Sequence, residues 1–141
     1  MEIIQNIKLD PDAISRHFTQ LGDDFVDNLT KLVDVELYAV KLSELSRMNA
    51  VLVNQDLVGL IAYYQNLDKN EKFISHVGVI PFWQNKGLAS NLIKSVINAS
   101  PGCKIRLEVF EENLVARKLY ETLDFKVSAI FGSKLTLERF S

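Results

Sequence analysis

The sequence predicts a single domain of the α/β class built on a mixed sheet, and three observations support this. The chain has 141 residues, of which 48% are hydrophobic and 24% charged, as in one globular domain. Strand and helix patterns alternate along most of it, in the order βααβββαβαββ. One stretch, Phe73 to Ile97, joins a strand to a helix through a polar glycine turn. We expect the other elements to be arranged around this stretch, within one domain that spans residues 1–141.

The first third of the chain predicts a short strand followed by two helices. Met1 to Lys8 contains the apolar residues of the strand. The segment Asp10 to Asp12 is typical of a helix start, because Asp caps the first turn and proline is tolerated at the first helical position. Asp23 to Lys31 is compatible with either a loop or a short helix. Asp34 to Ser46 predicts the second helix, with one apolar face.

Strand patterns then dominate. Ala50 to Val53 and Leu57 to Tyr64 predict a hairpin, and the polar segment Asn66 to Lys72 predicts a solvated loop. Beyond the central stretch we expect a strand, a helix and a final hairpin: Lys104 to Val109, Asn113 to Thr122, and Phe125 to Phe131 with Lys134 to Arg139.

The central stretch is suited to hold an anion. Its strand, Phe73 to Ile80, ends at Pro81, and a polar turn, Gln84 to Gly87, leads into the helix. Paired apolar positions recur in this helix every three or four residues, at Leu88, Ala89, Leu92, Ile93, Val96 and Ile97. The first amides of a helix lack partners within it, and the helix dipole adds roughly half a positive charge at that end.

The distribution of charge supports an anion at this turn. Residues 73–107 carry four Lys or Arg and no Asp or Glu, whereas the rest of the chain carries all 18 acids and 12 bases. Lys86 lies where the dipole disfavours a cation, and Gly87 would cost about 1 kcal/mol relative to alanine if it were helical. Both are understandable if a polyanion lies against the turn.

Two motifs follow each other here. The first is Val79-x-Pro81 followed by Gln84-x-x-Gly87-x-Ala89, and the second is Asn113-x-x-Ala116-x-x-Leu119-Tyr120 with Asp124-Phe125 after it. Together they resemble the GNAT superfamily of acyl-CoA-dependent N-acyltransferases. The acetyl-CoA signature of that family is the six-residue pattern (Gln/Arg)-x-x-Gly-x-(Gly/Ala). The second motif departs from the family at Asp124, where the family has glycine.

The resemblance implies a fold and an activity. The strands Phe73 to Ile80 and Lys104 to Val109 are expected to be parallel neighbours that splay to admit the pantetheine arm of acetyl-CoA. The Val79 N–H would polarise the thioester carbonyl, and backbone amides of the turn would hold the pyrophosphate. The acetyl group would pass directly to a primary amine, without a metal. The resemblance assigns these residues to the cofactor: Val79, Gln84, Asn85, Lys86, Gly87, Leu88, Ala89, Ser90 and Asn113.

Asn113 and Tyr120 are two helical turns apart and lie on nearly the same face. The resemblance implies that Asn113 binds the pantetheine arm and that Tyr120 protonates the departing thiolate. The residues alone also allow a purely structural pair, with Asn113 as a helix cap and Tyr120 in the core.

The amine acceptor must lose a proton before it attacks. A lysine-like amine is about 3.4 pH units from its neutral form at pH 7, a cost of roughly 4.6 kcal/mol. His76 is the residue of the central strand that titrates near neutral pH, which makes it a candidate general base. Glu108, Glu111 and a chain of waters are the alternatives.

Composition excludes several classes of protein. A net charge of −2 argues against non-specific nucleic-acid binding, and no apolar run reaches the ~18 residues of a membrane helix. We expect a cytoplasmic protein, monomeric or homodimeric, that acts on a small-molecule or peptide amine. One rival is a non-catalytic acyl-CoA-binding or regulatory module on the same fold. A second, a nucleotide-binding protein, lacks both Gly-x-Gly-x-x-Gly and Gly-Lys-Ser/Thr.

Overall fold

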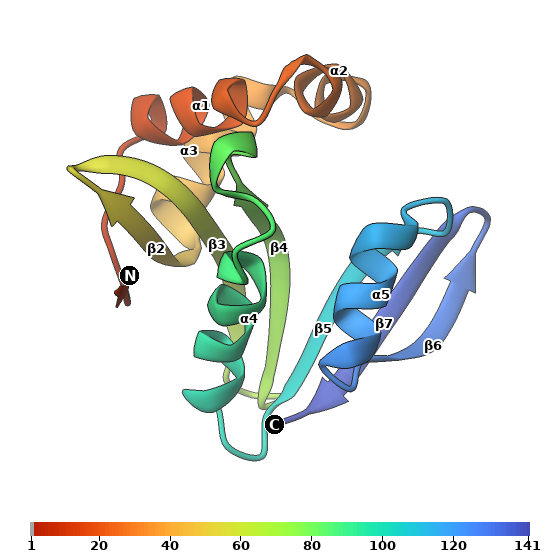
Figure 1. Cartoon of the computed structure of the whole chain (residues 1–141). Helices are drawn as coiled ribbons and strands as arrows, with labels where there is room; N and C mark the ends of the chain where they lie inside the picture. Colours follow the sequence, from red (N-terminus) through yellow and green to blue (C-terminus); the bar gives the residue numbers. More distant parts are fainter. Residues whose placement is uncertain (1) are drawn as a thin grey trace.

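The computed structural model describes residues 2–141, and its strands form one mixed sheet (Figure 1). In chain order the strands are β1 (Ile3–Ile4), β2 (Arg47–Val53), β3 (Asp56–Asn66), β4 (Glu71–Val79), β5 (Lys104–Phe110), β6 (Lys126–Phe131) and β7 (Lys134–Phe140). Their order across the sheet is β1-β2-β3-β4-β5-β7-β6. Neighbouring strands pair antiparallel, apart from the parallel pair β4 and β5 at the centre.

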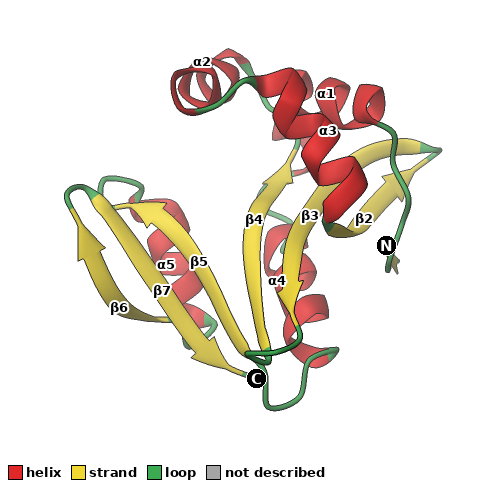
Figure 2. Cartoon of the chain, turned by 180° about the vertical axis from the view of Figure 1, so that it is seen from behind, coloured by secondary structure: helices red, strands yellow, loops and turns green. Residues whose placement is uncertain are grey.

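Helices cover parts of both faces. They are α1 (Pro11–Gln20), α2 (Asp23–Leu32), α3 (Val35–Leu45), α4 (Leu88–Asn98) and α5 (Leu114–Thr122), with a short 3₁₀ turn η1 (Pro81–Trp83) before α4. Helices α1 and α3 lie over β2 to β4 on one face, and α4 and α5 lie on the other (Figures 1 and 2). The predicted mixed α/β fold is confirmed, and α2 settles the segment that the sequence left between loop and helix. The expected loop at 66–72 is shorter, because β3 runs to Asn66 and β4 begins at Glu71.

The two central strands separate part of the way along their length. Residues Glu71 to Ile74 of β4 pair with Lys104 to Leu107 of β5, and the pairing stops there. Strand β4 nevertheless continues to Val79, and β5 to Phe110. The sheet therefore opens into a V, as both views of the chain show (Figures 1 and 2). This confirms the predicted splay.

A bulge in β4 changes which residues face each layer of helices. Ala62 of β3 pairs with His76 and the next residue, Tyr63, pairs with Ile74, so Ser75 is an additional residue in β4. Before the bulge, Ile74 packs in the core under α4. After it, Val79 packs in that core, whereas His76 contacts α1. The bulge thus turns Val77 and Val79 towards the helix that follows them.

Two hydrophobic cores hold the layers together. The larger lies between the sheet and helices α4 and α5, and includes the fully buried Leu92, Ile93 and Ile105. The smaller lies under α1 and α3 and includes Ile14 and Phe18. Each such side chain contributes about 1.5 to 3 kcal/mol when fully buried. Helix α2 has no fully buried residue and packs against this core through the half-buried Phe25 and Leu29, so it is held less firmly than its neighbours.

The smaller core contains a pair of histidines. The Nε2 atoms of His17 in α1 and His76 in β4 are 2.9 Å apart, so one nitrogen donates and the other accepts. The rings of Phe18 and Phe25 pack against His76. Burial lowers the pKa of His17 to about 4. Burial, and then the charge of His17, lower the pKa of His76 well below its usual value of 6.5. Both imidazoles are therefore neutral at pH 7.

Helix α5 ends in a left-handed residue. The amide of Phe125 donates to the carbonyl of Tyr120 at 3.1 Å, and the amide of Asp124 donates to that of Glu121 at 3.0 Å. These are the two bonds of the Schellman motif. Asp124 has a φ angle of 67°, in the region that glycine adopts without strain. Asp124 therefore occupies a left-handed position, at the point where the family has glycine.

Replacing Asp124 by glycine should stabilise the protein by up to about 1 kcal/mol, because glycine adopts the left-handed conformation freely. The change also removes a negative charge at the carboxyl end of a helix. Urea unfolding measures the effect, and Asp124→Ala, which keeps a Cβ, serves as the matched control. A loss of stability in the glycine variant would mean that the aspartate has a partner of its own.

The histidine pair predicts a loss of stability in mild acid. In the unfolded chain both histidines bind protons near pH 6.5, whereas in the folded protein they do so only at much lower pH. Their contribution is therefore complete above about pH 6.5 and is lost as pH falls. For His17 alone the loss between pH 7 and pH 5 is about 2 kcal/mol.

The double variant His17→Phe/His76→Phe keeps two aromatic rings at these positions but removes both titrations. Its free energy of unfolding should vary less between pH 7 and pH 5 than that of the unchanged protein. Equal pH dependence in the two proteins would show that the histidines are not held neutral by the fold.

Candidate active site

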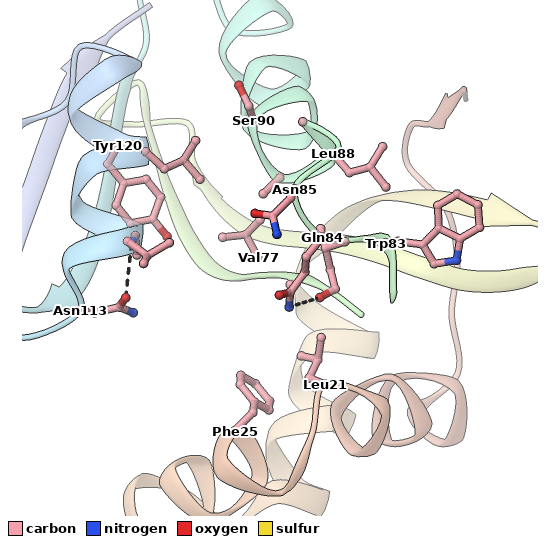
Figure 3. A pocket seen from close by; sticks show the side chains of 17 residues that line it. Leu21, Phe25, Val77, Trp83, Gln84, Asn85, Leu88, Ser90, Asn113 and Tyr120 are labelled. Carbon is pink, nitrogen blue, oxygen red and sulfur yellow. Dashed lines mark hydrogen bonds between the residues drawn. The ribbon is translucent and has the colours of Figure 1, made fainter. Parts of the chain in front are cut away.

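A cavity of about 540 Å³ lies where β4 and β5 diverge (Figure 3). Its walls come from the end of β4, the turn before α4, the first turn of α4, helix α5, and the α1–α2 junction. It brings together most of the residues that the sequence assigned to cofactor binding and catalysis: Val79, Gln84, Asn85, Gly87, Leu88, Ala89, Ser90, Asn113 and Tyr120. Lys86 and His76 do not line it.

The turn before α4 presents unbonded amides to this cavity. Gly87 is the N-cap of α4, with φ 80° and ψ 8°, and no side chain caps this end of the helix. The first amide of α4 that donates a hydrogen bond to a preceding carbonyl is that of Asn91, which donates to the Gly87 carbonyl at 3.0 Å. The amides of Leu88, Ala89 and Ser90 precede it and have no partner within the helix. All three residues line the cavity, so three donors and the positive end of the dipole meet there.

The position of Gly87 differs from one sequence-based expectation. The residue precedes the helix and is left-handed, so the cost of a helical glycine does not apply. A Cβ atom built on Gly87 would meet nothing within 4 Å, and the reason for glycine here is its φ angle of 80°.

The open edge of β4 also faces the gap. The amide of Ile80 donates to the carbonyl of Val58 in β3 at 2.9 Å. Because successive amides of a strand point to opposite edges, the N–H of Val79 points away from β3, towards the gap that β5 has left. The Val79 carbonyl accepts a hydrogen bond from Nε2 of Gln84 at 3.0 Å. This bond ties the turn to the end of the strand.

Asn113 and Tyr120 reach the cavity from α5. The Oδ1 atom of Asn113 accepts from the amide of Ala116 at 3.2 Å, which caps the helix and leaves the Nδ2 donors free. The ring of Tyr120 packs against Phe125, with 6.0 Å between ring centroids, and the phenol is directed into the cavity (Figure 3). The structural roles that the sequence allowed for this pair therefore coexist with a place in the site.

Burial sets the protonation state of Tyr120. The residue is 8% exposed, and burial raises the pKa of its phenol to about 12. The phenol therefore stays protonated throughout the neutral range. That is the state in which it can donate a proton to a leaving group.

His76 lies behind the wall of the cavity. A Cβ built on Gly78, a lining residue, would be 3.0 Å from Nε2 of His76 and 2.9 Å from Leu21. The imidazole therefore packs directly behind Gly78, with its Nε2 bonded to His17. The sequence pointed to His76 but not to His17, because a contact between residues 59 positions apart leaves no local pattern.

The α1–α2 junction is the part of the site that the sequence did not indicate. Leu21 and Phe25 line the cavity opposite the turn before α4 (Figure 3). They lie in and beside a segment whose secondary structure was ambiguous, so their apolar character alone could not place them.

Two properties of the described chain complete the description of the site. Within residues 2–141, no helix combines the length and the apolar character needed to cross a membrane. The same residues contain no group of three or more His, Cys, Asp or Glu side chains arranged to hold a metal ion.

Solved structures share this fold. The PaiA N-acetyltransferase of Thermoplasma acidophilum, in complex with coenzyme A, is 14% identical with a TM-score of 0.73, and the alignment covers 100% of both chains. The ribosomal-protein-S18-alanine N-acetyltransferase of Escherichia coli is 17% identical with a TM-score of 0.77, over 99% of this chain and 92% of that one. Arabidopsis thaliana NAA60, in complex with a bisubstrate analogue, is 15% identical with a TM-score of 0.72, and the alignment covers 99% of this chain and 98% of that one.

The sequence itself also has a family match. Comparison with curated protein sequences finds no match. The sequence model of the Acetyltransferase (GNAT) family, however, matches residues 17–125, which include the turn before α4 and the whole second motif from Asn113 to Phe125. With a match over most of its length, the chain belongs to the Acetyltransferase (GNAT) family.

Proposed function

We propose that the protein is an N-acetyltransferase that moves the acetyl group of acetyl-CoA directly to a primary amine. The observation that carries this proposal is the single cavity in which the free amides of α4, the open edge of β4 and the Tyr120 phenol meet. The complex of a similarly folded N-acetyltransferase with coenzyme A supports the choice of cofactor.

The residues present fit coenzyme A. The amides of Leu88, Ala89 and Ser90 supply donors for the pyrophosphate, and the exposed Lys86 lies beside the same turn. Because β5 has separated from β4 at this point, the amide of Val79 has no partner in a neighbouring strand. It is free to bond the amide-bearing pantetheine arm, which would lie where that strand would otherwise be. The free Nδ2 donors of Asn113 face this arm from α5.

The chemistry follows from these positions. The amine lone pair forms a bond to the thioester carbon, and the carbonyl electrons move onto oxygen. With the Val79 amide on the pantetheine arm, the gap-facing amide of Val77, which also lines the cavity, stabilises the resulting oxyanion. The C–S bond then breaks, and the thiolate takes the proton of the Tyr120 phenol. Water restores the phenol.

The proton of the amine needs its own acceptor. The role of His76 as general base stays a prediction. Its ring lies behind Gly78, outside the cavity lining, and burial lowers the pKa of its imidazole. In our proposal the proton therefore leaves through water in the cavity. Tyr120 is the one titratable side chain among the lining residues. This fact also favours a second candidate, a module that binds acyl-CoA without turnover.

Replacing Tyr120 by phenylalanine separates the two candidates. The change removes one oxygen and keeps the ring against Phe125. For an enzyme, kcat should fall on the order of 10²-fold while the affinity for acetyl-CoA changes little. Release of coenzyme A with a panel of primary amines measures kcat, and calorimetry measures the affinity.

The matched control is Tyr63→Phe, a buried tyrosine of β3 that does not line the cavity. An unchanged rate in a folded Tyr120→Phe variant would return Tyr120 to a packing role. Acetyl-CoA binding without acetylation of any amine in the panel would instead favour the binding module.

A further inference from the structure

A second, smaller cavity lies on the opposite face of the sheet. It has a volume of about 210 Å³ and is lined by Phe73 of β4, Arg106 and Glu108 of β5, and Thr136 of β7. Their strand neighbours, Ile74, Leu107 and Leu135 among them, point into the core under α4 and α5. Because side chains alternate along a strand, the four lining residues point to the other face. Over β5, β7 and β6 no helix covers that face (Figure 2).

This cavity, which we call the fork pocket, lies where the two central strands begin to part. Phe73 pairs with Arg106, and the next pair, Ile74 with Leu107, is the last one between β4 and β5. Glu108 is the first residue of β5 beyond the pairing. The fork pocket therefore lies at the closed end of the gap, on the face opposite α4 and its amides.

Arg106 enters the fork pocket with its hydrogen bonds unfilled. Its Nε is buried and has no hydrogen-bond partner among residues 2–141. The guanidinium lies over the ring of Phe73, with 5.4 Å from its carbon to the ring centroid, which restricts its orientation. A buried donor of a charged group without an acceptor is costly, and a carboxylate supplies the acceptors that a guanidinium fits best.

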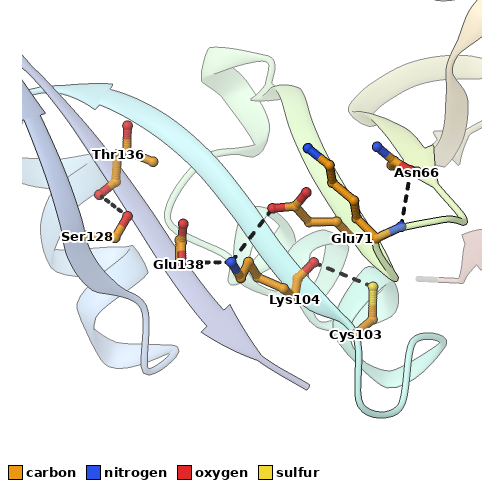
Figure 4. A network of polar contacts seen from close by, with 8 residues as sticks. Asn66, Glu71, Cys103, Lys104, Ser128, Thr136 and Glu138 are labelled. Carbon is orange, nitrogen blue, oxygen red and sulfur yellow. Dashed lines mark hydrogen bonds and ion pairs between the residues drawn. The ribbon is translucent and has the colours of Figure 1, made fainter.

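The neighbouring carboxylates do not satisfy Arg106. Glu138 lies directly opposite it in the β5–β7 register, but its Oε2 atom is 3.6 Å from Nζ of Lys104. Lys104 also lies 3.9 Å from Glu71 (Figure 4). These are the two ion pairs of the described residues, so Arg106 and Glu108 pair neither with each other nor with a third residue there.

The spacing of the two free charges fits a molecule with both an amine and a carboxylate. Arg106 and Glu108 are two residues apart on one strand, which separates them by about 6.6 Å. Extended chains of five or six bonds span a similar length. Thr136 adds a hydroxyl to the wall opposite Glu108, its partner in the β5–β7 register. At ~30 Å³ per water, the cavity holds about seven waters, the size of such a small molecule.

The distance along β4 from the fork pocket to the gap-facing amide of Val77 agrees with an acceptor of this length. Phe73 and Val77 are four residues apart with one bulge between them, or about 10 to 13 Å. An amine approaches a carbonyl carbon to ~3 Å, and a carboxylate lies ~3 Å from a guanidinium. The remainder, roughly 4 to 7 Å, separates the amine from the carboxylate of the acceptor.

We infer that the fork pocket binds the carboxylate of the acceptor, which is an ω-amino acid or a dipeptide, through Arg106, with Glu108 facing its ammonium end. This inference rests on the proposed transfer to an amine. It narrows the open list of amines to those that carry a carboxylate about six bonds away.

Two matched pairs of acceptors test the inference: 6-aminohexanoate against hexylamine, and glycylglycine against glycylglycinamide. The carboxylate-bearing member should be acetylated with at least a tenfold higher kcat/KM. In Arg106→Gln this preference should disappear, mainly through a higher KM for the carboxylate-bearing member of each pair. Arg106→Lys, which keeps a charge but not the fork of donors, should retain part of the preference.

The control variant is Lys126→Gln, which removes an exposed cation of β6 that does not line the fork pocket. It should keep the preference of the unchanged protein. Acetylation of both members of each pair at equal efficiency, or a preference that survives Arg106→Gln, would overturn the inference and leave the proposed function standing.

A binding measurement separates this inference from the proposed function. In ¹⁵N spectra without acetyl-CoA, the Nε–H resonance of Arg106 should shift on addition of 6-aminohexanoate and not on addition of hexylamine. A shift in a protein that acetylates no amine would support the carboxylate site and contradict the enzyme. No shift with 6-aminohexanoate would remove the site.

Discussion

The early end of the pairing between β4 and β5 is the constraint on which the rest of the structure depends. A parallel pair at the centre of a sheet would normally bond along its full length. Here it stops after Ile74 and Leu107, although both strands continue. Backbone groups beyond that point have no neighbouring strand, and a ligand with amides of its own can take its place. The two halves of the sheet remain connected through the base of the V and share the larger core under helices α4 and α5.

Local features of the chain direct chemistry into this gap. The bulge at Ser75 turns the end of β4 so that Val79 packs under α4 while its amide faces the opening. The left-handed Gly87 starts α4 without a side-chain cap, which leaves three amides free. The hydrogen bond between Gln84 and the Val79 carbonyl holds the turn and the strand together. The anion site and the open strand edge are therefore held together, and the Tyr120 phenol faces them from α5 in the same cavity. Helix α2, which has no fully buried residue, borders the opening.

Sequence alone predicted the parts whose cause is local. The strand, turn and helix of residues 73–97 have a clear period, and Asn113 and Tyr120 follow at a fixed helical spacing, so their meeting in one cavity could be expected. Helix α2 could not be assigned, since its N-cap Gly22 offers no capping side chain and no residue of α2 is fully buried. The contact of His17 with His76 and that of Arg106 with Phe73 arise from packing and from strand pairing. Such contacts between distant segments have no signature in the sequence.

Titration of ¹⁵N-labelled protein with acetyl-CoA tests the central claim that the gap between β4 and β5 holds the cofactor. The amide resonances of Val77, Val79 and the first turn of α4 from Leu88 to Ser90 should show the largest shifts. Amides of β1 and β2, at the far edge of the sheet, should change little. Shifts confined to the uncovered face over β5, β7 and β6, or no shifts at saturating acetyl-CoA, would contradict the account.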